Sequence, residues 1–161
     1  MREITKKALK LYQGYYDINT EEPFKPFAAE ATFHIDGANY FLFKSAVIAR
    51  QESYEYVFFA EEEDLTVERV QELDEIAWKE GFSRIHPHSE HRNSDVTLVI
   101  LSDHVDSAVQ KCAKKLHHYK SYKFGIWGWT NYRVIILDET KRELTCNRQG
   151  ESLKSLFQQI I

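Results

Sequence analysis

Residues that make flexible linkers and covalent cross-links are scarce in this sequence. Its 161 residues include six glycines, three prolines and two cysteines, so long flexible linkers are not expected. The length suits one hydrophobic core, and the 43% hydrophobic and 29% charged residues exclude a disordered chain. We therefore predict a single domain that comprises residues 1–161.

Long apolar segments are also missing. No stretch approaches the roughly 20 apolar residues that span a membrane, and the charged N-terminus precedes no apolar run of signal-peptide length. The two cysteines, Cys112 and Cys146, lack the C-x-x-C spacing of zinc and redox motifs, which indicates buried free thiols. We therefore expect a cytoplasmic protein without a membrane partner.

An excess of positive charge is absent as well. The net charge of -4 and the isoelectric point near 6.0 argue against a duplex-DNA partner, because phosphate binding needs a basic excess. The nucleophile elbow G-x-S-x-G, the P-loop and the dinucleotide-binding motif G-x-G-x-x-G do not occur. The sequence therefore leaves open whether the protein is an enzyme, and it identifies neither a catalytic residue nor a cofactor.

Hydrophobic periodicity predicts an α+β fold in the order α-β-β-β-α-β-α-β-β-α. Strands that are first joined by hairpins and later separated by helices indicate a mixed, largely antiparallel sheet with helices packed on it. The predicted helices are 2–13, 66–80, one with the inner stripe Val105, Val109, Cys112 and Leu116, and 151–160; the predicted strands are 31–35, 38–48, 54–60, 96–101, 132–137 and 143–146.

Local signals refine this prediction. The Asp-Gly pair at 36–37 favours a hairpin turn, and the continuous apolar run 96–101 favours a strand near the centre of the sheet. Gly81 is placed for the C-terminal cap of the helix before it. Ser102 or Asp103 is expected to cap the helix that follows the central strand.

A polar loop before the central strand contains metal-ligating residue types. His86, His88, Glu90 and His91 offer imidazole and carboxylate groups, which bind transition metals or act as a general base near neutral pH. Their spacing matches no zinc motif, and the loop is not a rigid element. The alternative, that these polar surface residues order the loop before a buried strand, therefore stays open.

The third predicted helix has a basic face. Such a surface in an acidic protein suits a phosphate, a nucleotide or an acidic partner. The alternative is an ordinary solvated face whose lysines complement the helix dipole. The positive side chains recur at helical spacing and continue past the helix end: Lys111, Lys114, Lys115, His118, Lys120 and Lys123.

Aromatic residues are interleaved with basic and polar ones between residues 120 and 133. This pattern is typical of surfaces that stack on bases or on ring-bearing ligands. In an extended chain Trp127 and Trp129 point to one face, and Gly125 and Gly128 permit a ligand or backbone to approach closely. Core packing of the tryptophans is the alternative. The candidate ligand-binding residues are Lys120, Lys123, Trp127, Trp129, Asn131 and Arg133.

The predicted order α-β-β-β-α-β is similar to the core of restriction-endonuclease-like nucleases. The site of that family needs an aspartate on one strand and an acid-x-lysine pair on the next, which hold Mg²⁺. Asp36 lies in a predicted turn, the strand 54–60 lacks lysine, and the Glu-Thr-Lys triplet at 139–141 also lies in a predicted turn. An active nuclease is therefore disfavoured, whereas a degenerate relative without activity fits the order.

Short motifs occur in sequence along the chain: PHSEH at 87–91, KSYKFG at 120–125, GW at 128–129 and NRQG at 147–150. In this order they resemble a family of small bacterial proteins of unknown function. The resemblance covers the chain from the first hairpin to the last helix and implies a bacterial, cytoplasmic protein. It implies no activity, cofactor or catalytic residue.

Two functional hypotheses follow. The first is a non-enzymatic binding or regulatory module for an anionic or aromatic ligand or a protein partner, held by the candidate ligand-binding residues and the basic helix face. The second is a metal-assisted hydrolase that uses the loop 86–91. A homodimer is compatible with both, because exposed aromatic residues favour dimer faces.

Overall fold

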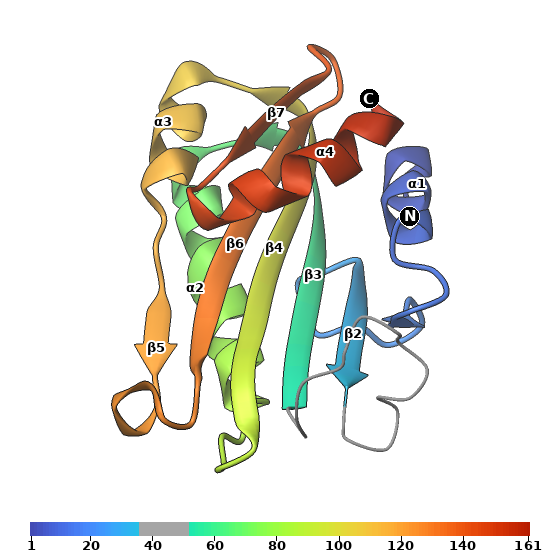
Figure 1. Ribbon diagram of the computed structural model, residues 1–161. Coiled ribbons are helices and arrows are strands. Elements are labelled where there is room, and N and C mark those ends of the chain that lie inside the picture. Colours follow the sequence, from blue (N-terminus) through green and yellow to red (C-terminus); the bar gives the residue numbers. More distant parts are fainter. Residues whose placement is uncertain (36–51) are drawn as a thin grey trace.

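The computed structural model describes residues 1–35 and 52–161, whose strands form one sheet (Figure 1). These strands are β1 (Asp17–Asn19), β2 (Ala29–Ile35), β3 (Glu52–Leu65), β4 (His91–Val105), β5 (Tyr119–Ser121), β6 (Trp129–Asp138) and β7 (Glu143–Cys146). Their order is β1-β2-β3-β4-β6-β5, and β7 also pairs with β6. The pairs β3–β4 and β4–β6 are parallel, and the other pairs are antiparallel. The predicted α+β class with a mixed, largely antiparallel sheet is confirmed.

Helices cover both faces of this sheet. They are α1 (Glu3–Lys10), α2 (Val67–Ser83), α3 (Ser107–Lys115) and α4 (Lys154–Phe157), with 3₁₀ turns at Lys123–Gly125, Gln149–Leu153 and Gln158–Ile160. α2 and α3 pack on one face, and α1 and α4 pack on the other (Figure 1). α2 links β3 to β4, and α3 lies between β4 and β6, because parallel neighbours need a long crossover connection.

β4 is buried on both faces, as the apolar run in its sequence predicts. Residues 96–101 are at most 1% exposed. Successive side chains of a strand point to opposite faces, so this one segment supplies both cores. The side chains that enter the core under α2 and α3 are Val96, Leu98 and Ile100, and those that enter the core under α1 and α4 are Val99 and Leu101.

Two expectations about helix ends are wrong. Gly81 lies inside α2, and a Cβ at this position would lie 2.6 Å from Cγ1 of Val96. The glycine is therefore needed where the helix approaches the strand closely, and not for a cap. Ser102 and Asp103 both lie within β4, and Asp106 caps α3 by accepting a hydrogen bond of 2.8 Å from the backbone N–H of Val109.

Other differences concern short or weakly periodic segments. The predicted strand 38–48 and the turn 36–37 lie outside the described residues. The strands β1 and β5 are each three residues long, which is too short to give a periodic signal. The single helix predicted at 151–160 is instead the short α4 flanked by 3₁₀ turns.

Asn147 completes the outer edge of β6 between β5 and β7. Its Oδ1 accepts a hydrogen bond of 2.9 Å from the N–H of Val134, and its Nδ2 donates one of 3.1 Å to the carbonyl of Tyr132. Gly150 packs closely here, since a Cβ would lie 2.3 Å from the carbonyl oxygen of Val134. The motif at 147–150 therefore has a structural role in joining the two edge strands.

Candidate binding site at the basic edge of the sheet

A compact loop, residues 122–128, joins β5 to β6 at the outer edge of the sheet (Figure 1). The N–H of Tyr122 donates a hydrogen bond of 3.0 Å to the carbonyl of Gly128. In return, the carbonyl of Tyr122 accepts from the N–H groups of Gly125 (2.9 Å) and Trp127 (3.2 Å). The loop is thus closed by its own backbone hydrogen bonds.

The histidine-rich loop and the aromatic loop meet at His91, which is fully buried. Its Nδ1 lies 2.6 Å from the carbonyl oxygen of Trp127, and its Nε2 lies 2.7 Å from Oγ of Ser94. Gly128 packs closely against β4, because a Cβ at this position would lie 1.7 Å from the carbonyl oxygen of Arg92. His91 and Gly128 therefore fasten the loop to β4.

Several side chains of this loop are turned to solvent. Phe124 is 104% exposed, Ile126 is 74% exposed and Trp129 is 38% exposed. Trp127 is half-buried, and Nζ of Lys123 lies 5.1 Å from the centre of its ring in a cation–π contact. Neither tryptophan belongs to the two cores of the described residues. Because residue 127 lies in a turn, the alternation expected for an extended chain does not apply.

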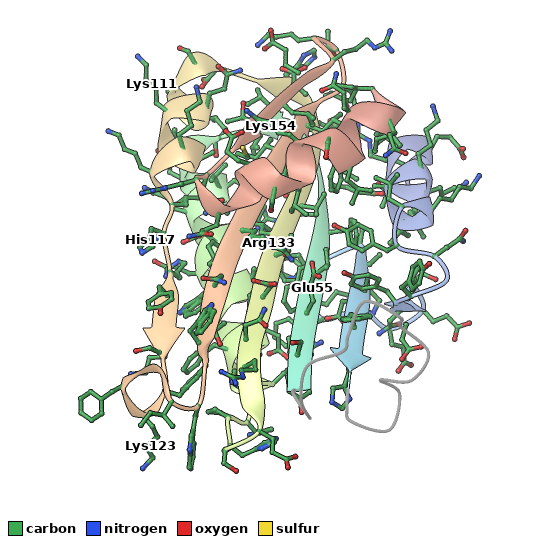
Figure 2. The ribbon with its side chains drawn as sticks, viewed as in Figure 1. Glu55, Lys111, His117, Lys123, Arg133 and Lys154 are labelled. Atoms are coloured by element: carbon green, nitrogen blue, oxygen red, sulfur yellow. The ribbon has the colours of Figure 1, made fainter. Side chains whose placement is uncertain are left out.

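Positive charge is concentrated along this edge. Residues 107–137 include six Lys and Arg residues and no Asp or Glu, whereas the rest of the chain has 15 basic and 25 acidic residues. Figure 2 shows Lys111, His117 and Lys123 along one side of the molecule, from α3 to the loop. We use the term basic edge for the exposed lysines of this stretch: Lys111, Lys114, Lys115, Lys120 and Lys123.

His118, which was predicted on the basic face, points inward. Its Nε2 lies 2.8 Å from Oδ2 of the buried Asp74, and its ring stacks on Trp78 with the ring centres 5.0 Å apart. Tyr132 meets the same ring edge-on at 4.8 Å. Since α3 ends at Lys115, residue 118 no longer follows the helical spacing. The placement of His118 with the exposed lysines is therefore wrong.

Asn131 and Arg133 lie on a different surface, the sheet face below α4, where Figure 2 labels Arg133 beside Glu55. The guanidinium of Arg133 pairs with Glu55 and lies 3.6 Å from Oδ2 of Asp95. Asn131 donates a hydrogen bond of 3.3 Å to the other oxygen of Asp95. The hydroxyl of Tyr16 donates one of 2.5 Å to Glu55. We call Glu55, Asp95 and Arg133 the sheet-face cluster.

The charges of the sheet-face cluster are held in a partly desolvated environment. The side chains of Arg133 and Glu55 are 14% and 13% exposed. Burial raises the pKa of the Glu55 carboxyl, an effect that Arg133 and the hydrogen bond from Tyr16 oppose. The hydroxyl of Tyr12 is buried without a hydrogen-bond partner among the described residues, and burial also raises its pKa. Because two carboxylates neutralise Arg133, this residue adds little to the basic edge.

The candidate metal ligands take different positions. His86 and Glu90 are exposed, and Nδ1 of His88 accepts a hydrogen bond of 3.2 Å from the N–H of Glu90. Both ring nitrogens of His91 have partners already. Within residues 1–35 and 52–161, no group of three or more His, Cys, Asp or Glu side chains is arranged to hold a metal ion. The metal-site hypothesis stays a prediction.

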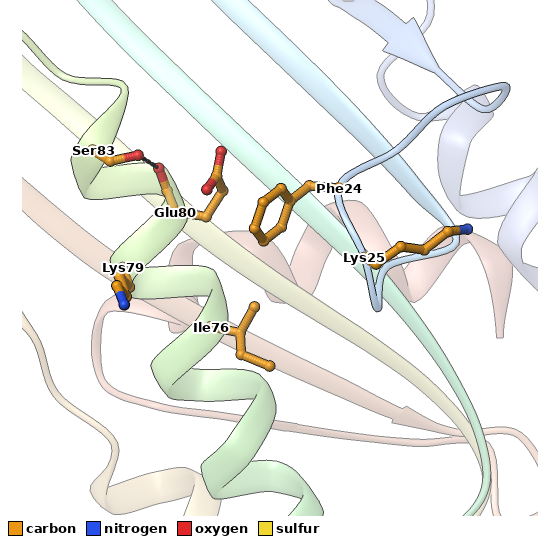
Figure 3. Close-up of a pocket in the computed structure, with 6 residues that line it drawn as sticks. All are labelled: Phe24, Lys25, Ile76, Lys79, Glu80 and Ser83. Carbon is orange, nitrogen blue, oxygen red and sulfur yellow. Dashed lines mark hydrogen bonds between the residues drawn. The ribbon is translucent and has the colours of Figure 1, made fainter.

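A cavity of about 340 Å³ lies between α2 and the segment before β2 (Figure 3). This volume is in the range of small-molecule sites. Its wall is partly polar, and Oγ of Ser83 donates a hydrogen bond of 2.7 Å to the carbonyl of Glu80. None of the candidate residues from the sequence lines it; the lining residues are Phe24, Lys25, Ile76, Lys79, Glu80 and Ser83.

The described residues define an α+β protein with a mixed sheet, an exposed basic edge and a partly buried ion-pair cluster. None of their helices is both long and apolar enough to cross a membrane. Residues 1–159 match the family model described as Domain of unknown function (DUF8052), and the chain belongs to that family. No curated protein and no solved structure matches the chain. The predicted resemblance to a family of unknown function is confirmed at this level.

Proposed function

We propose that this protein is a non-enzymatic binding module that holds an anionic partner against its basic edge. The observation that carries the proposal is the segregation of charge: residues 107–137 contain the five exposed lysines of the basic edge and no Asp or Glu, in a chain of net charge -4. A patch of one sign attracts the opposite charge over roughly 8–10 Å at physiological salt. The basic edge therefore favours a polyanion over a neutral ligand.

Aromatic rings lie next to these charges. Tyr119 on β5 is 52% exposed, and its strand partner is Asn131, two residues beyond Trp129. Tyr119 and Trp129 therefore share one face of the sheet. Rings beside lysines suit an anionic partner that also has an aromatic or apolar part. Lys120 pairs with Thr130 and points to the opposite face, so it adds positive charge without a place beside these rings. The ring contact of Lys123 with Trp127 supports Lys123 and Trp129 as binding residues.

A solvated helix face accounts for only part of the basic edge. The lysines near the C-terminus of α3 complement the helix dipole, as any amphipathic helix allows. Lys120 and Lys123 lie beyond the end of α3 at Lys115, so the helix dipole does not account for them, and Lys123 contacts the ring of Trp127. Their position supports binding more directly than that of the helix lysines.

We also propose a bacterial, cytoplasmic location for this module. Cys112 and Cys146 are free thiols, which suits a reducing compartment. The cytoplasm offers many polyanions, among them nucleic acids, acidic proteins and anionic lipid headgroups. The location would be rejected by finding the native protein outside the cytoplasm after cell fractionation.

Reversing two charges of the basic edge tests the proposal. The double variant Lys120→Glu/Lys123→Glu should lose the salt-sensitive binding of poly-L-glutamate and of a single-stranded oligonucleotide, measured by fluorescence anisotropy. The control Lys25→Glu/Lys79→Glu makes the same change in net charge beside the cavity of Figure 3. It should keep the affinity within about twofold, because distant exposed charges are screened.

Two results would reject the proposal. If both double variants lost affinity equally, binding would depend on net charge and not on the basic edge. If the wild-type protein bound no polyanion of any kind at low salt, the basic edge would be an ordinary solvated surface.

A further inference from the structure

The tip of the loop 122–128 holds apolar side chains in water. Phe124 and Ile126 are 104% and 74% exposed, and Phe124 and Lys123 have left-handed φ angles of 55° and 48°. Residues other than glycine rarely adopt this conformation. The N–H of Ile126 donates a hydrogen bond of 3.0 Å to the carbonyl of Lys123, which helps to hold it. Core packing does not explain a strained backbone that displays a phenyl ring, and such strain concentrates at functional sites.

Positive charges lie close to this apolar tip in the chain, since Lys123 precedes Phe124 and Lys120 is in the strand that leads into the loop. Lys120 and Lys123 are exposed on either side of Tyr122. Near α3 the positive charge is partly offset by the carboxylate of Glu143, which accepts a hydrogen bond of 3.4 Å from Gln110 of that helix. The pKa of Glu151 there is lowered by its hydrogen bond to Lys154 and, more weakly, by the charge of Lys114. The lysines beside the tip are therefore the ones best placed to act together with Phe124.

We infer that the anionic partner is a membrane surface that contains anionic lipids. Phe124 and Ile126 would insert at the level of the headgroups, while Lys120 and Lys123 contact the lipid phosphates. This inference rests on the proposed function and names its partner. Exposed aromatic and aliphatic side chains next to lysines are typical of segments that lie in the membrane interface.

Other polyanions fit the tip less well. A projecting ring needs no pocket in a bilayer, whereas a protein partner must supply a matching pocket and an interface of roughly 800 Å² on each side. A single-stranded nucleic acid stacks on rings but gains nothing from exposing Ile126. The absence of a spanning segment in the sequence led us to expect no membrane partner, but docking of two side chains at a surface requires no such segment.

Sedimentation with lipid vesicles tests this inference on the full chain. We expect binding to vesicles of phosphatidylcholine mixed with phosphatidylglycerol, but not to phosphatidylcholine alone, and release at high salt. Phe124→Ser should lower the partitioning by about tenfold, because an inserted phenyl ring is lost. Its melting temperature should not change, since the ring is outside both cores. The matched control is Tyr15→Ser, which removes another exposed ring and should bind as the wild type does.

The outcomes separate the two proposals. If the wild type ignores the mixed vesicles, or if Phe124→Ser binds them as well as the wild type does, the membrane inference is overturned. If the wild type ignores vesicles yet binds poly-L-glutamate or the oligonucleotide through Lys120 and Lys123, the membrane inference fails and the proposed function stands. If no polyanion of any kind binds, both fail.

Discussion

Replacing Arg133 with methionine should destabilise the fold, because two partly buried carboxylates would lose their counter-charge. The Arg133 side chain pairs with Glu55 and lies 3.6 Å from Oδ2 of Asp95. Its Nε also donates a hydrogen bond of 3.1 Å to Oγ1 of Thr97. Methionine keeps an unbranched stem without a charge, so the substitution tests the ion pairs more than the packing.

The expected magnitude follows from the burial of the three groups. Removing one partner of a buried ion pair costs about 3–5 kcal/mol in the free energy of unfolding. Asp95 is 21% exposed and keeps part of its hydration, so we expect the lower end of this range. Glu55→Gln in the Arg133→Met background should restore about 1–2 kcal/mol, because it removes one uncompensated charge. Urea unfolding followed by tryptophan fluorescence measures both values.

The cost should also depend on pH. Burial raises the pKa of Glu55 in the folded state, so the folded protein binds this proton more tightly than the unfolded protein does. The resulting stabilisation is present at low pH and is lost as the pH rises through the folded-state pKa. Without Arg133 the carboxylate is disfavoured further, so the penalty should be largest at neutral pH and shrink toward about pH 4–5. A penalty that does not change with pH, or one below about 1 kcal/mol, would refute this account of the sheet-face cluster.

Three further predictions concern the fold. Gly128→Ala should lower the melting temperature strongly, because its Cβ would lie 1.7 Å from the carbonyl oxygen of Arg92. Gly14→Ala, whose Cβ would have nothing within 4 Å, should cost only about 1 kcal/mol in the free energy of unfolding. Equal losses of stability in the two variants would contradict the close approach of Gly128 to β4. Asn147→Ala should cost about 3 kcal/mol in urea unfolding, since its amide satisfies buried backbone groups of β6, and a change near zero would exclude that role. Burial raises the pKa of Cys146 to about 11, so a thiol reagent at about pH 8 should label Cys112 first, and faster labelling of Cys146 would oppose this assignment.

The elements that could be predicted from the sequence are those with long apolar patterns. The apolar run 96–101 correctly predicted the central strand, since a strand that is buried on both faces has few polar positions. The helix predicted at 66–80 matches most of α2. The strands β1 and β5 could not be found, because three residues gain their conformation from the strands they pair with. Gly81 has the sequence signature of a helix end, and only the distance to Val96 reveals its packing role.

The candidate site was predictable only in part. Lys120 and Lys123 stand out in composition, and the structure leaves both exposed. Glu55, Asp95 and Arg133 come from three strands far apart in the sequence, and the register of the sheet alone brings them together. A charged residue in one strand carries no local signal for its partner on another strand, so the sheet-face cluster had to come from the structure.

Hydrogen exchange with and without poly-L-glutamate tests the central claim, that the basic edge binds anions, most directly. Binding should slow the exchange of amides in β5 and in the loop 122–128, because bound polyanion suppresses local opening of these segments. Amides of α2 should exchange as before, since none of the basic edge lies on that helix. Slower exchange in α2, with β5 and the loop unaffected, would contradict the assignment.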